Sequence, residues 1–336
     1  MIRGIAARSP LRISFAGGGT DVEPFASEFG TAIVSATIDL FAEVDASKFD
    51  GESIVINSID TGERISLTAW NDLELKNHLI SACSLILPRE KRMGLSLSFS
   101  SPVAPGSGLG ASSALVVAMV KALFGLQGKN LTNMELAALA LRVERDDLKI
   151  AGGFQDQYAS TFGGFNYIEA NKSNVQVTPL SISREFRKEL EQQLILIDLS
   201  LPRSGQNVIA DQQRNITIKN PTSLAATKKQ LELGRKMRFA FLGEDPELIG
   251  KLMSESWYAK RDYSSKITTP RIDAIVSKLE SLRVLGAKVT GAGGGGHLLA
   301  MLDDRSRLRV LEYLEKEKIH TLEFTFTNEG ATQWNI

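Results

Sequence analysis

The sequence predicts an α+β chain with two domains, and three observations support this. Short alternating runs typical of strands fill much of the first half. Long apolar-periodic segments typical of helices occupy residues 223–285. The chain then ends in the order strand, glycine loop, strand, helix, strand, which suits a second and smaller layered domain. At 336 residues it is long enough for two cores.

The elements of the first half follow from alternation, capping and glycine breaks. Thr132 and Glu135 form a capping box that starts a helix running to about residue 148, and Gly152-Gly153 ends it. Strands are predicted at 12–16, 31–38, 41–46, 53–57 and 95–100, and helices at 23–28, 73–87, 111–126 and 155–162.

The second half begins with a polar segment, 201–223, that is expected to be irregular and could serve as a substrate loop. Helices are predicted at 223–242, at 246–263 with Pro246 in the first turn, and at 272–285. The closing pattern is strand 288–290, glycine loop, strand 297–302, helix 306–318 and strand 321–327.

Composition excludes several classes of protein. Lys+Arg and Asp+Glu both number 39, and this balance argues against broad binding to nucleic acid or to an anionic membrane. The single cysteine, Cys83, rules out an internal disulfide and suits a reducing compartment. The N-terminus lacks the apolar core of a secretory signal, and the apolar stretch 111–126 contains Lys121 and is too short to span a bilayer. We therefore expect a cytoplasmic protein.

A glycine-rich loop between a predicted strand and a predicted helix is the most informative motif. Backbone N–H groups of such a loop crowd around an anion, and the helix N-terminus adds partial positive charge, so phosphate is the usual occupant. Gly-Lys-Ser/Thr is missing, so the loop is not a Walker A motif. The hydroxyls of Ser112 and Ser113 are placed where they could contact a metal–phosphate group. The loop is Pro105-Gly106-Ser107-Gly108-Leu109-Gly110-Ala111-Ser112-Ser113.

Two further glycine clusters, at 17–19 and 291–296, lie far from this loop in the sequence. Glycine costs conformational entropy, so a cluster indicates that something approaches the backbone closely. Three clusters in one chain favour a composite site over three unrelated tight turns.

Two carboxylates flank the predicted glycine break. Glu144 lies near the end of one helix, and Asp156 follows in Gln155-Asp156-Gln157. Across such a break they can converge on one cleft, one to hold a metal and one for acid–base chemistry. Near the N-terminus, Arg12 lies on a strand and Asp21 follows a flexible glycine turn.

Together these motifs resemble the superfamily of galactokinase, homoserine kinase, mevalonate kinase and phosphomevalonate kinase, the GHMP kinases. Segments 10–21, 105–114 and 288–296 resemble its three motifs, in order and over nearly the whole chain. The resemblance implies a two-domain fold, with an N-terminal domain like ribosomal protein S5 domain 2 over 1–185 and a ferredoxin-like C-terminal domain over 186–336. A homodimer is a further expectation.

Within the superfamily, segments 10–21, 153–166 and 324–330 are most similar to D-glycero-D-manno-heptose 7-phosphate kinases. These kinases resemble the kinase part of fucokinases. The resemblance implies transfer of the ATP γ-phosphate to C1 of the heptose 7-phosphate, giving the 1,7-bisphosphate. One departure is Gly205-Gln206-Asn207, where the heptose kinases continue as a helix starting with Ala or Glu.

The resemblance also implies the role of each site residue. Asp156 is the catalytic base, and Arg12 keeps it ionised and offsets transition-state charge. Segment Pro105–Ser113 binds the triphosphate of ATP. Glu144 and one of Ser112 and Ser113 hold Mg²⁺. Arg203 is a candidate ligand of the phosphate on the sugar. The other expected substrate contacts are Gly18, Gly19, Thr20, Asp21, Gln155, Gly293 and Gly294.

Three alternatives stand beside this interpretation. Segment 106–111 also fits the dinucleotide pattern Gly-x-Gly-x-x-Gly/Ala, but no strand ending in an acid follows about 20 residues later, as that fold needs. A non-catalytic sugar sensor would have no need of Asp156, Arg12 and Glu144. A superfamily member acting on a mevalonate-type or amino-acid substrate is disfavoured by the Arg12 and Thr20-Asp21 pattern.

Overall fold

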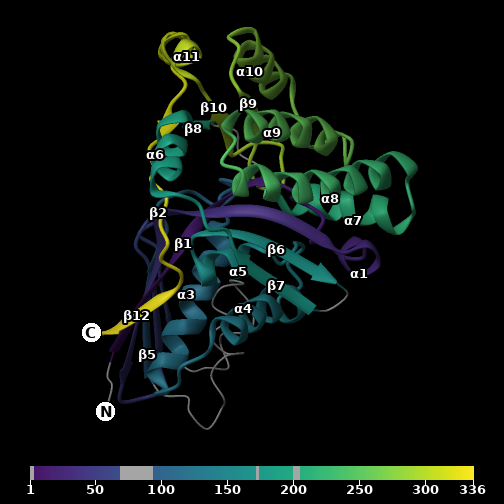
Figure 1. Ribbon diagram of the computed structural model, residues 1–336. Helices are drawn as coiled ribbons and strands as arrows, with labels where there is room; N and C mark the ends of the chain where they lie inside the picture. Colours follow the sequence, from purple (N-terminus) through teal and green to yellow (C-terminus); the bar gives the residue numbers. More distant parts are fainter. Residues whose placement is uncertain (1–3, 69–93, 172–173, 200–204) are drawn as a thin grey trace.

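The computed structural model describes residues 4–68, 94–171, 174–199 and 205–336. It is a mixed helix and sheet structure with two sheets (Figure 1). The predicted helix at 73–87, Cys83 and Arg203 lie outside the described residues.

The larger sheet runs in the order β12-β1-β2-β5-β3-β4, and β6 and β7 extend it from β2. Its pairs are antiparallel except β3 with β5, which is parallel. The strands are β1 (Gly4–Ala16), β2 (Thr31–Phe49), β3 (Ile54–Ser58), β4 (Arg64–Leu67), β5 (Gly94–Ser100), β6 (Phe165–Asn171), β7 (Asn174–Pro179) and β12 (Thr332–Asn335).

Helices cover both faces of this sheet, with α3, α4 and α5 on one side of β1 and β2 and α8 and α9 on the other (Figure 1). Helix α3 (Ala111–Leu126) is apolar on almost every side and is nearly all buried, as expected for a helix inside the core. After α4 (Asn133–Arg142), a π-helical turn (Val143–Asp147) leads toward α5 (Gln155–Phe162). The face of α8 (Pro221–Leu242) places Phe241 edge-on against Phe15 of β1, with ring centroids 4.7 Å apart.

The smaller sheet has the order β11-β8-β10-β9 and a second core built around residues such as Trp257, Ile272 and Leu298. Its strands are β8 (Leu194–Asp198), β9 (Gly286–Val289), β10 (His297–Met301) and β11 (Thr321–Leu322). The remaining helices are α1 (Phe25–Phe29), α6 (Arg184–Gln193), α7 (Gly205–Thr217), α9 (Pro246–Arg261), α10 (Pro270–Ser281) and α11 (Asp304–Lys316).

The end of the chain passes from the smaller sheet back to the larger one. The predicted strand 321–327 pairs with β8 only over Thr321–Leu322, and Phe326 then forms an isolated bridge with Ile38 of β2. Strand β12 pairs with β1, so the two termini lie close together (Figure 1). The predicted domain division at 185/186 stays a prediction.

One predicted loop is wrong. Segment 205–217 is the helix α7, because Val208, Gln212 and Ile216 recur once per turn and are all buried. The two strands predicted at 31–38 and 41–46 form the single strand β2, since Asp39 stays extended and bonds to the chain at Thr325.

Candidate active site

A cavity of about 470 Å³ lies where the three glycine clusters meet. Its wall draws on β1 of the larger sheet, on the loop between β9 and β10, and on helices of both halves of the chain. The lining includes Arg12, Gly19, Asp21, Val22, Pro105, Gly106, Ser107, Gly108, Gly110, Ala111, Ser112, Ser113, Glu144, Arg145, Ile150, Ala151, Gly152, Gly153, Gln155, Asp156, Ile209, Gln212, Lys260, Gly291 and Ala292.

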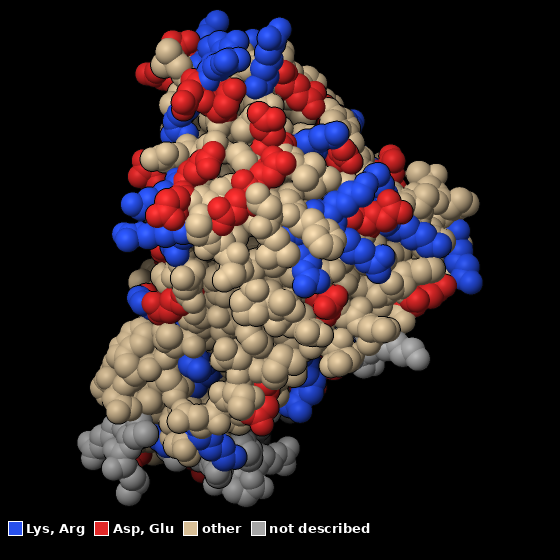
Figure 2. Space-filling model, viewed as in Figure 1, with Lys and Arg blue, Asp and Glu red and all other residues tan. Residues whose placement is uncertain are grey.

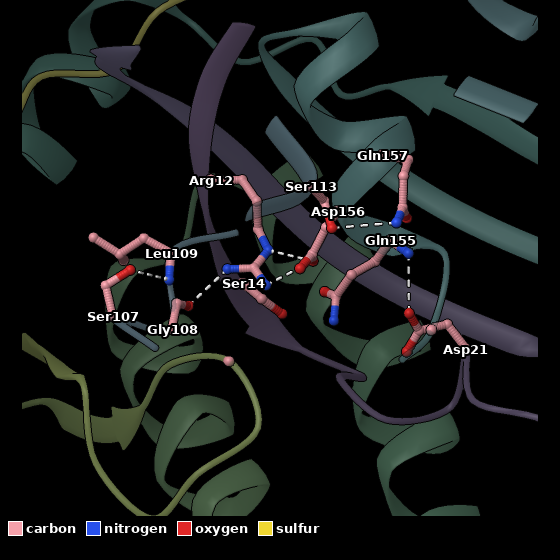
Figure 3. Close-up of polar contacts among 12 residues, drawn as sticks. Arg12, Ser14, Asp21, Ser107, Gly108, Leu109, Ser113, Gln155, Asp156 and Gln157 are labelled. Atoms are coloured by element: carbon pink, nitrogen blue, oxygen red, sulfur yellow. Dashed lines mark hydrogen bonds and ion pairs between the residues drawn. The ribbon is translucent and has the colours of Figure 1, made fainter. Parts of the chain in front are cut away.

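The central contact of the cavity joins Arg12 of β1 to Asp156 of α5 (Figure 3). Nε and Nη2 of Arg12 lie 2.8 and 2.6 Å from Oδ1 of Asp156. The third nitrogen, Nη1, donates to the carbonyl oxygen of Gly108 at 2.7 Å. Arg12 is buried, whereas the Asp156 side chain keeps 22% of its surface exposed toward the cavity. The guanidinium thus joins the carboxylate to the glycine-rich loop in one fixed unit.

The glycine-rich loop ends at the N-terminus of α3, where Gly110 adopts φ +77° in the left-handed region. The backbone N–H of Arg12 donates to the carbonyl of Leu109 at 2.9 Å and so ties the loop to β1. A long buried helix with its N-terminus open to a cavity is a favourable place for an anion.

The third glycine cluster packs against this loop. A Cβ added at Gly296 would lie 2.4 Å from the carbonyl oxygen of Ser107 and 2.8 Å from that of Gly106. The backbone N–H of His297 donates to the Ser107 carbonyl at 3.0 Å. Only glycine allows two backbone segments to approach this closely.

Glu144 lies on the π-helical turn beside α3 and is almost completely buried. Gln157 of α5 donates through Nε2 to Oε2 of Glu144 and, at 3.2 Å, to Oγ of Ser113. Burial raises the pKa of Glu144, and Arg145, Ser113 and Gln157 act in the opposite direction. Ser113 is buried within this cluster, whereas Ser112 is exposed to the cavity.

These groups suit a magnesium ion that has few protein ligands. One carboxylate and the serine hydroxyls are hard oxygen donors, and Mg²⁺ takes its other ligands from water and substrate phosphates. Among the described residues, no group of three or more His, Cys, Asp or Glu side chains could form an all-protein cage. The donor set therefore fits Mg²⁺ carried with a phosphate.

Asp21 forms the opposite wall, beside Gln155 (Figure 3). Its carboxylate accepts the backbone N–H of Gln155 at 3.0 Å and that of Gly19 at 3.2 Å. Burial raises the pKa of Asp21 despite these two bonds. Gly153 is required here, since a Cβ would lie 1.9 Å from Oδ2 of Asp21.

Most of the residues predicted for the site are brought together, but some are not. Thr20 is fully buried, and its hydroxyl donates to the carbonyl of Gly17 at 2.8 Å. Leu109 is also fully buried. Backbone contacts hold Gly293 and Gly294 near Ile267 and Lys266. None of these four residues, nor Gly18, is among the cavity-lining residues in the described part of the chain.

Several lining residues were not among those predicted from the sequence. Ile209 and Gln212 come from α7, the segment predicted as a loop, and Lys260 comes from α9. Gln212 donates to the carbonyl of Gly19 at 3.0 Å, which fixes the first glycine cluster. A helical reading of 205–217 could have placed Gln212 on the inner face. No local signal distinguishes Lys260 from the other lysines of the chain.

An anion loop at a helix N-terminus, next to an arginine-held carboxylate open to the same cavity, defines an enzyme of phosphoryl transfer. Comparison with known families agrees. The model of the GHMP kinases N terminal domain matches residues 77–164, and that of the GHMP kinases C terminal domain matches residues 237–320. Together they cover more than half of the chain, which belongs to the GHMP kinases. The predicted family, fold class and kinase activity are confirmed.

Among curated proteins, the chain is 30% identical over 343 residues to D-glycero-alpha-D-manno-heptose 7-phosphate kinase of Campylobacter jejuni, with 99% of each chain covered. It is 24% identical to the bifunctional fucokinase/GDP-fucose pyrophosphorylase of Arabidopsis thaliana, of which it spans only 30%.

Solved structures show the same similarity. A D-glycero-D-manno-heptose 1-phosphate kinase from Bacteroides thetaiotaomicron matches with a TM-score of 0.81 at 26% identity, with 99% of each chain covered. Lactococcus lactis galactokinase, solved with galactose, shares the fold with a TM-score of 0.76 at 18% identity, covering 98% of this chain and 95% of its own.

Charges of both signs are spread over the drawn face of the molecule (Figure 2). On the face drawn in Figure 2, Lys and Arg side chains alternate with Asp and Glu over the upper part of the molecule. Within the described ranges, no helix is long and apolar enough to cross a bilayer.

Proposed function

We propose that this kinase transfers the γ-phosphoryl group of ATP to the C1 hydroxyl of D-glycero-D-manno-heptose 7-phosphate, giving the 1,7-bisphosphate. The observation that carries the proposal is the Arg12–Asp156 pair beside the glycine-rich loop in one cavity. The full-length similarity to a heptose 7-phosphate kinase supports the choice of acceptor.

In this mechanism the side chains align the reactants and balance charge. Asp156 accepts the proton of the sugar hydroxyl. The hydroxyl oxygen then bonds to the γ-phosphorus of ATP, and ADP leaves. Arg12 holds the Asp156 carboxylate in place and stabilises its charge. Backbone N–H groups of 106–111, with the α3 N-terminus, hold the triphosphate.

Magnesium would be held by Glu144 and by Ser112 or Ser113, where it would neutralise phosphate charge. Because Ser113 shares Gln157 with Glu144 and Ser112 faces the cavity, the two hydroxyls have different surroundings. Asp21 and Gln155 line the wall beside Asp156 and are the groups that we assign to the sugar hydroxyls.

The proposal is tested by ATP turnover on a panel of hexoses, heptoses and their phosphates, with ³¹P NMR to locate the new phosphate. The expected result is a preference for the heptose 7-phosphate and a new anomeric phosphate at C1. Asp156→Asn protein, prepared in parallel, controls for contaminating kinases. A preference for free L-fucose would replace the proposal with a fucokinase-like activity, and binding without turnover would indicate a sugar sensor.

A further inference from the structure

Lys260 reaches the cavity from the last turn of α9, and no role has yet been given to it. Its side chain is nearly buried, and its Nζ donates to the carbonyl oxygen of Gly291 at the start of the third glycine cluster. Lys260 and Gly291 both line the cavity that holds Asp156. An ammonium group carried this far out of water is costly, unless its surroundings or a ligand compensate.

A second lysine, on β9, lies close enough to Lys260 and Arg12 for their charges to act on it. Lys288 of β9 is buried, and its Nζ donates to the carbonyl of Ser14 on β1 at 2.5 Å. The pKa of Lys288 lies well below the usual lysine value because of burial first, and then because of the charges of Lys260 and Arg12. Two positive side chains, Lys260 from α9 and Arg12 from β1, line the same cavity.

The acidic groups of the cavity wall are already engaged elsewhere. Asp156 is bonded to Arg12, Asp21 accepts two backbone N–H groups, and Glu144 accepts from Gln157. A phosphate in the cavity would be attracted by the positive charges of Lys260 and Arg12, which line the same wall. Phosphate is the anion that the cavity of a kinase must accommodate.

The end of α9 is firmly anchored, as a binding residue requires. Just beyond the helix, the hydroxyl of Tyr263 donates to the carbonyl of Gly18 at 3.2 Å. The side chain of Asn215 on α7 donates to the Tyr263 carbonyl at 2.8 Å. Lys260 is thus presented to the cavity from a fixed frame, so little order is lost when a ligand binds.

We propose that Lys260 is a further substrate-binding residue, whose ammonium group contacts a phosphate inside the cavity. This inference rests on the proposed kinase function. The phosphate has two sources with the same chemistry: the transferred γ-phosphate of ATP, or the phosphate that the sugar already carries.

The test replaces Lys260 with Gln, which removes the charge while keeping a donor for the Gly291 carbonyl. Lys260→Arg keeps the charge, and Lys251→Gln removes an exposed lysine of the same helix as the matched control. Steady-state constants are measured for ATP, for the best sugar phosphate and for the same sugar without its phosphate. Thermal melting confirms that each variant is folded.

A charge-assisted contact to phosphate is worth about 10- to 100-fold. If Lys260 binds the sugar's own phosphate, K260Q raises KM for the phosphorylated acceptor by that factor and leaves the unphosphorylated one unchanged. If it binds the γ-phosphate, kcat falls by that factor with both acceptors. In either case K260R retains most of the lost activity.

The proposal is overturned if folded K260Q matches K251Q in every constant, or if K260R loses as much as K260Q. If K260Q does not fold, K260R is compared with wild type on the two acceptors. A K260R variant that keeps both activities supports a charge contact. A K260R variant that loses both activities equally refutes the proposal. A wild type that prefers free sugars refutes the proposed acceptor alone, because the kcat comparison on those sugars still tests Lys260.

Discussion

The contact between Arg12 and Asp156 is the single interaction on which the proposed chemistry depends. It joins two residues that lie 144 positions apart in the sequence. Both residues, and the action of Arg12 on Asp156, were expected from the family resemblance. The further bond from Arg12 to Gly108 could be seen only in the fold.

Replacing Asp156 with Asn should reduce kcat by about 10²–10⁴-fold, because an amide cannot accept the hydroxyl proton. ATP binding should stay close to that of wild type, since the glycine-rich loop is untouched. Single-turnover rates and ADP titration calorimetry measure the two effects. A variant that keeps wild-type kcat would remove Asp156 from the chemistry.

Lys288 provides a test of stability against pH. Its pKa in the folded protein lies well below that of an unfolded lysine, because burial and neighbouring cations disfavour the charge. Between those two pKa values the unfolded state holds more protons, so the unfolding free energy rises with pH. Relative to Lys288→Met, the wild type should therefore gain stability as the pH rises toward about 10, the pKa of a lysine in an unfolded chain.

Thermal melts of both proteins at a series of pH values measure this change in stability. Lys251→Met, which replaces an exposed lysine, is the control, and its stability relative to wild type should not change with pH. A difference between wild type and K288M that stays constant with pH would show that the pKa of Lys288 is not lowered in the folded protein.

At the scale of elements, helices with strong local signals were predictable and pairing partners were not. Helix α3 and helix α5 begin and end where their apolar runs, glycine loops and glycine break indicate, and the Thr132–Glu135 capping box is present. Helix α7 was missed because its inner face carries Gln212 between Val208 and Ile216, which weakens the apolar period. The strand predicted at 321–327 was too long, because Phe326 pairs with Ile38 of the larger sheet and that pairing depends on the tertiary fold.

The packing of the third glycine cluster on the phosphate loop yields a prediction for Gly296→Ala. The new Cβ would lie 2.4 Å from the Ser107 carbonyl, so one loop must move. A displacement of about 1 Å at a reacting centre can cost 10²-fold in rate, and we expect a loss of that order in kcat/KM for ATP.

Gly62→Ala is the matched control for this change. Gly62 also has a positive φ, +68° against +78° for Gly296, but nothing lies within 4 Å of its added Cβ. Both variants place alanine at a positive φ, and only Gly296→Ala also meets a neighbouring backbone. Equal kinetics in the two would mean that the contact between the loops is not needed for ATP use.

At the scale of the whole molecule, the cavity is assembled from both halves of the chain. The three glycine clusters in the sequence predicted a composite site, and in the structure they meet at one cavity. The contributions of α7 and α9 could not be predicted, because they depend on how α7 packs against α8 and how α9 packs against β1 and β9. Long-range assembly thus supplies Gln212 and Lys260, which no local pattern marks.

The same long-range closure ties the C-terminus to the first strand. Strand β12 covers the edge of β1, with Thr332 opposite Arg8 and Asn335 opposite Ile5. Deleting residues 332–336 should expose that edge, lower the melting temperature and promote association, since an uncovered strand edge is a template for pairing. Each lost hydrogen bond contributes about 1 kcal/mol.

Differential scanning calorimetry and size-exclusion chromatography of the truncated chain make this measurement. A loss of 1 kcal/mol corresponds to a fall of about 2–4 °C for a domain of 150–250 residues. Trp334→Thr in the full-length chain is the control, because Trp334 is 45% exposed and threonine keeps the backbone ladder. If the point variant falls as far as the truncation, the stacking of Trp334 on Arg8 carries the stability. If neither falls, the pairing of β12 with β1 contributes nothing, and the closure of the large sheet by the chain's last residues is dispensable.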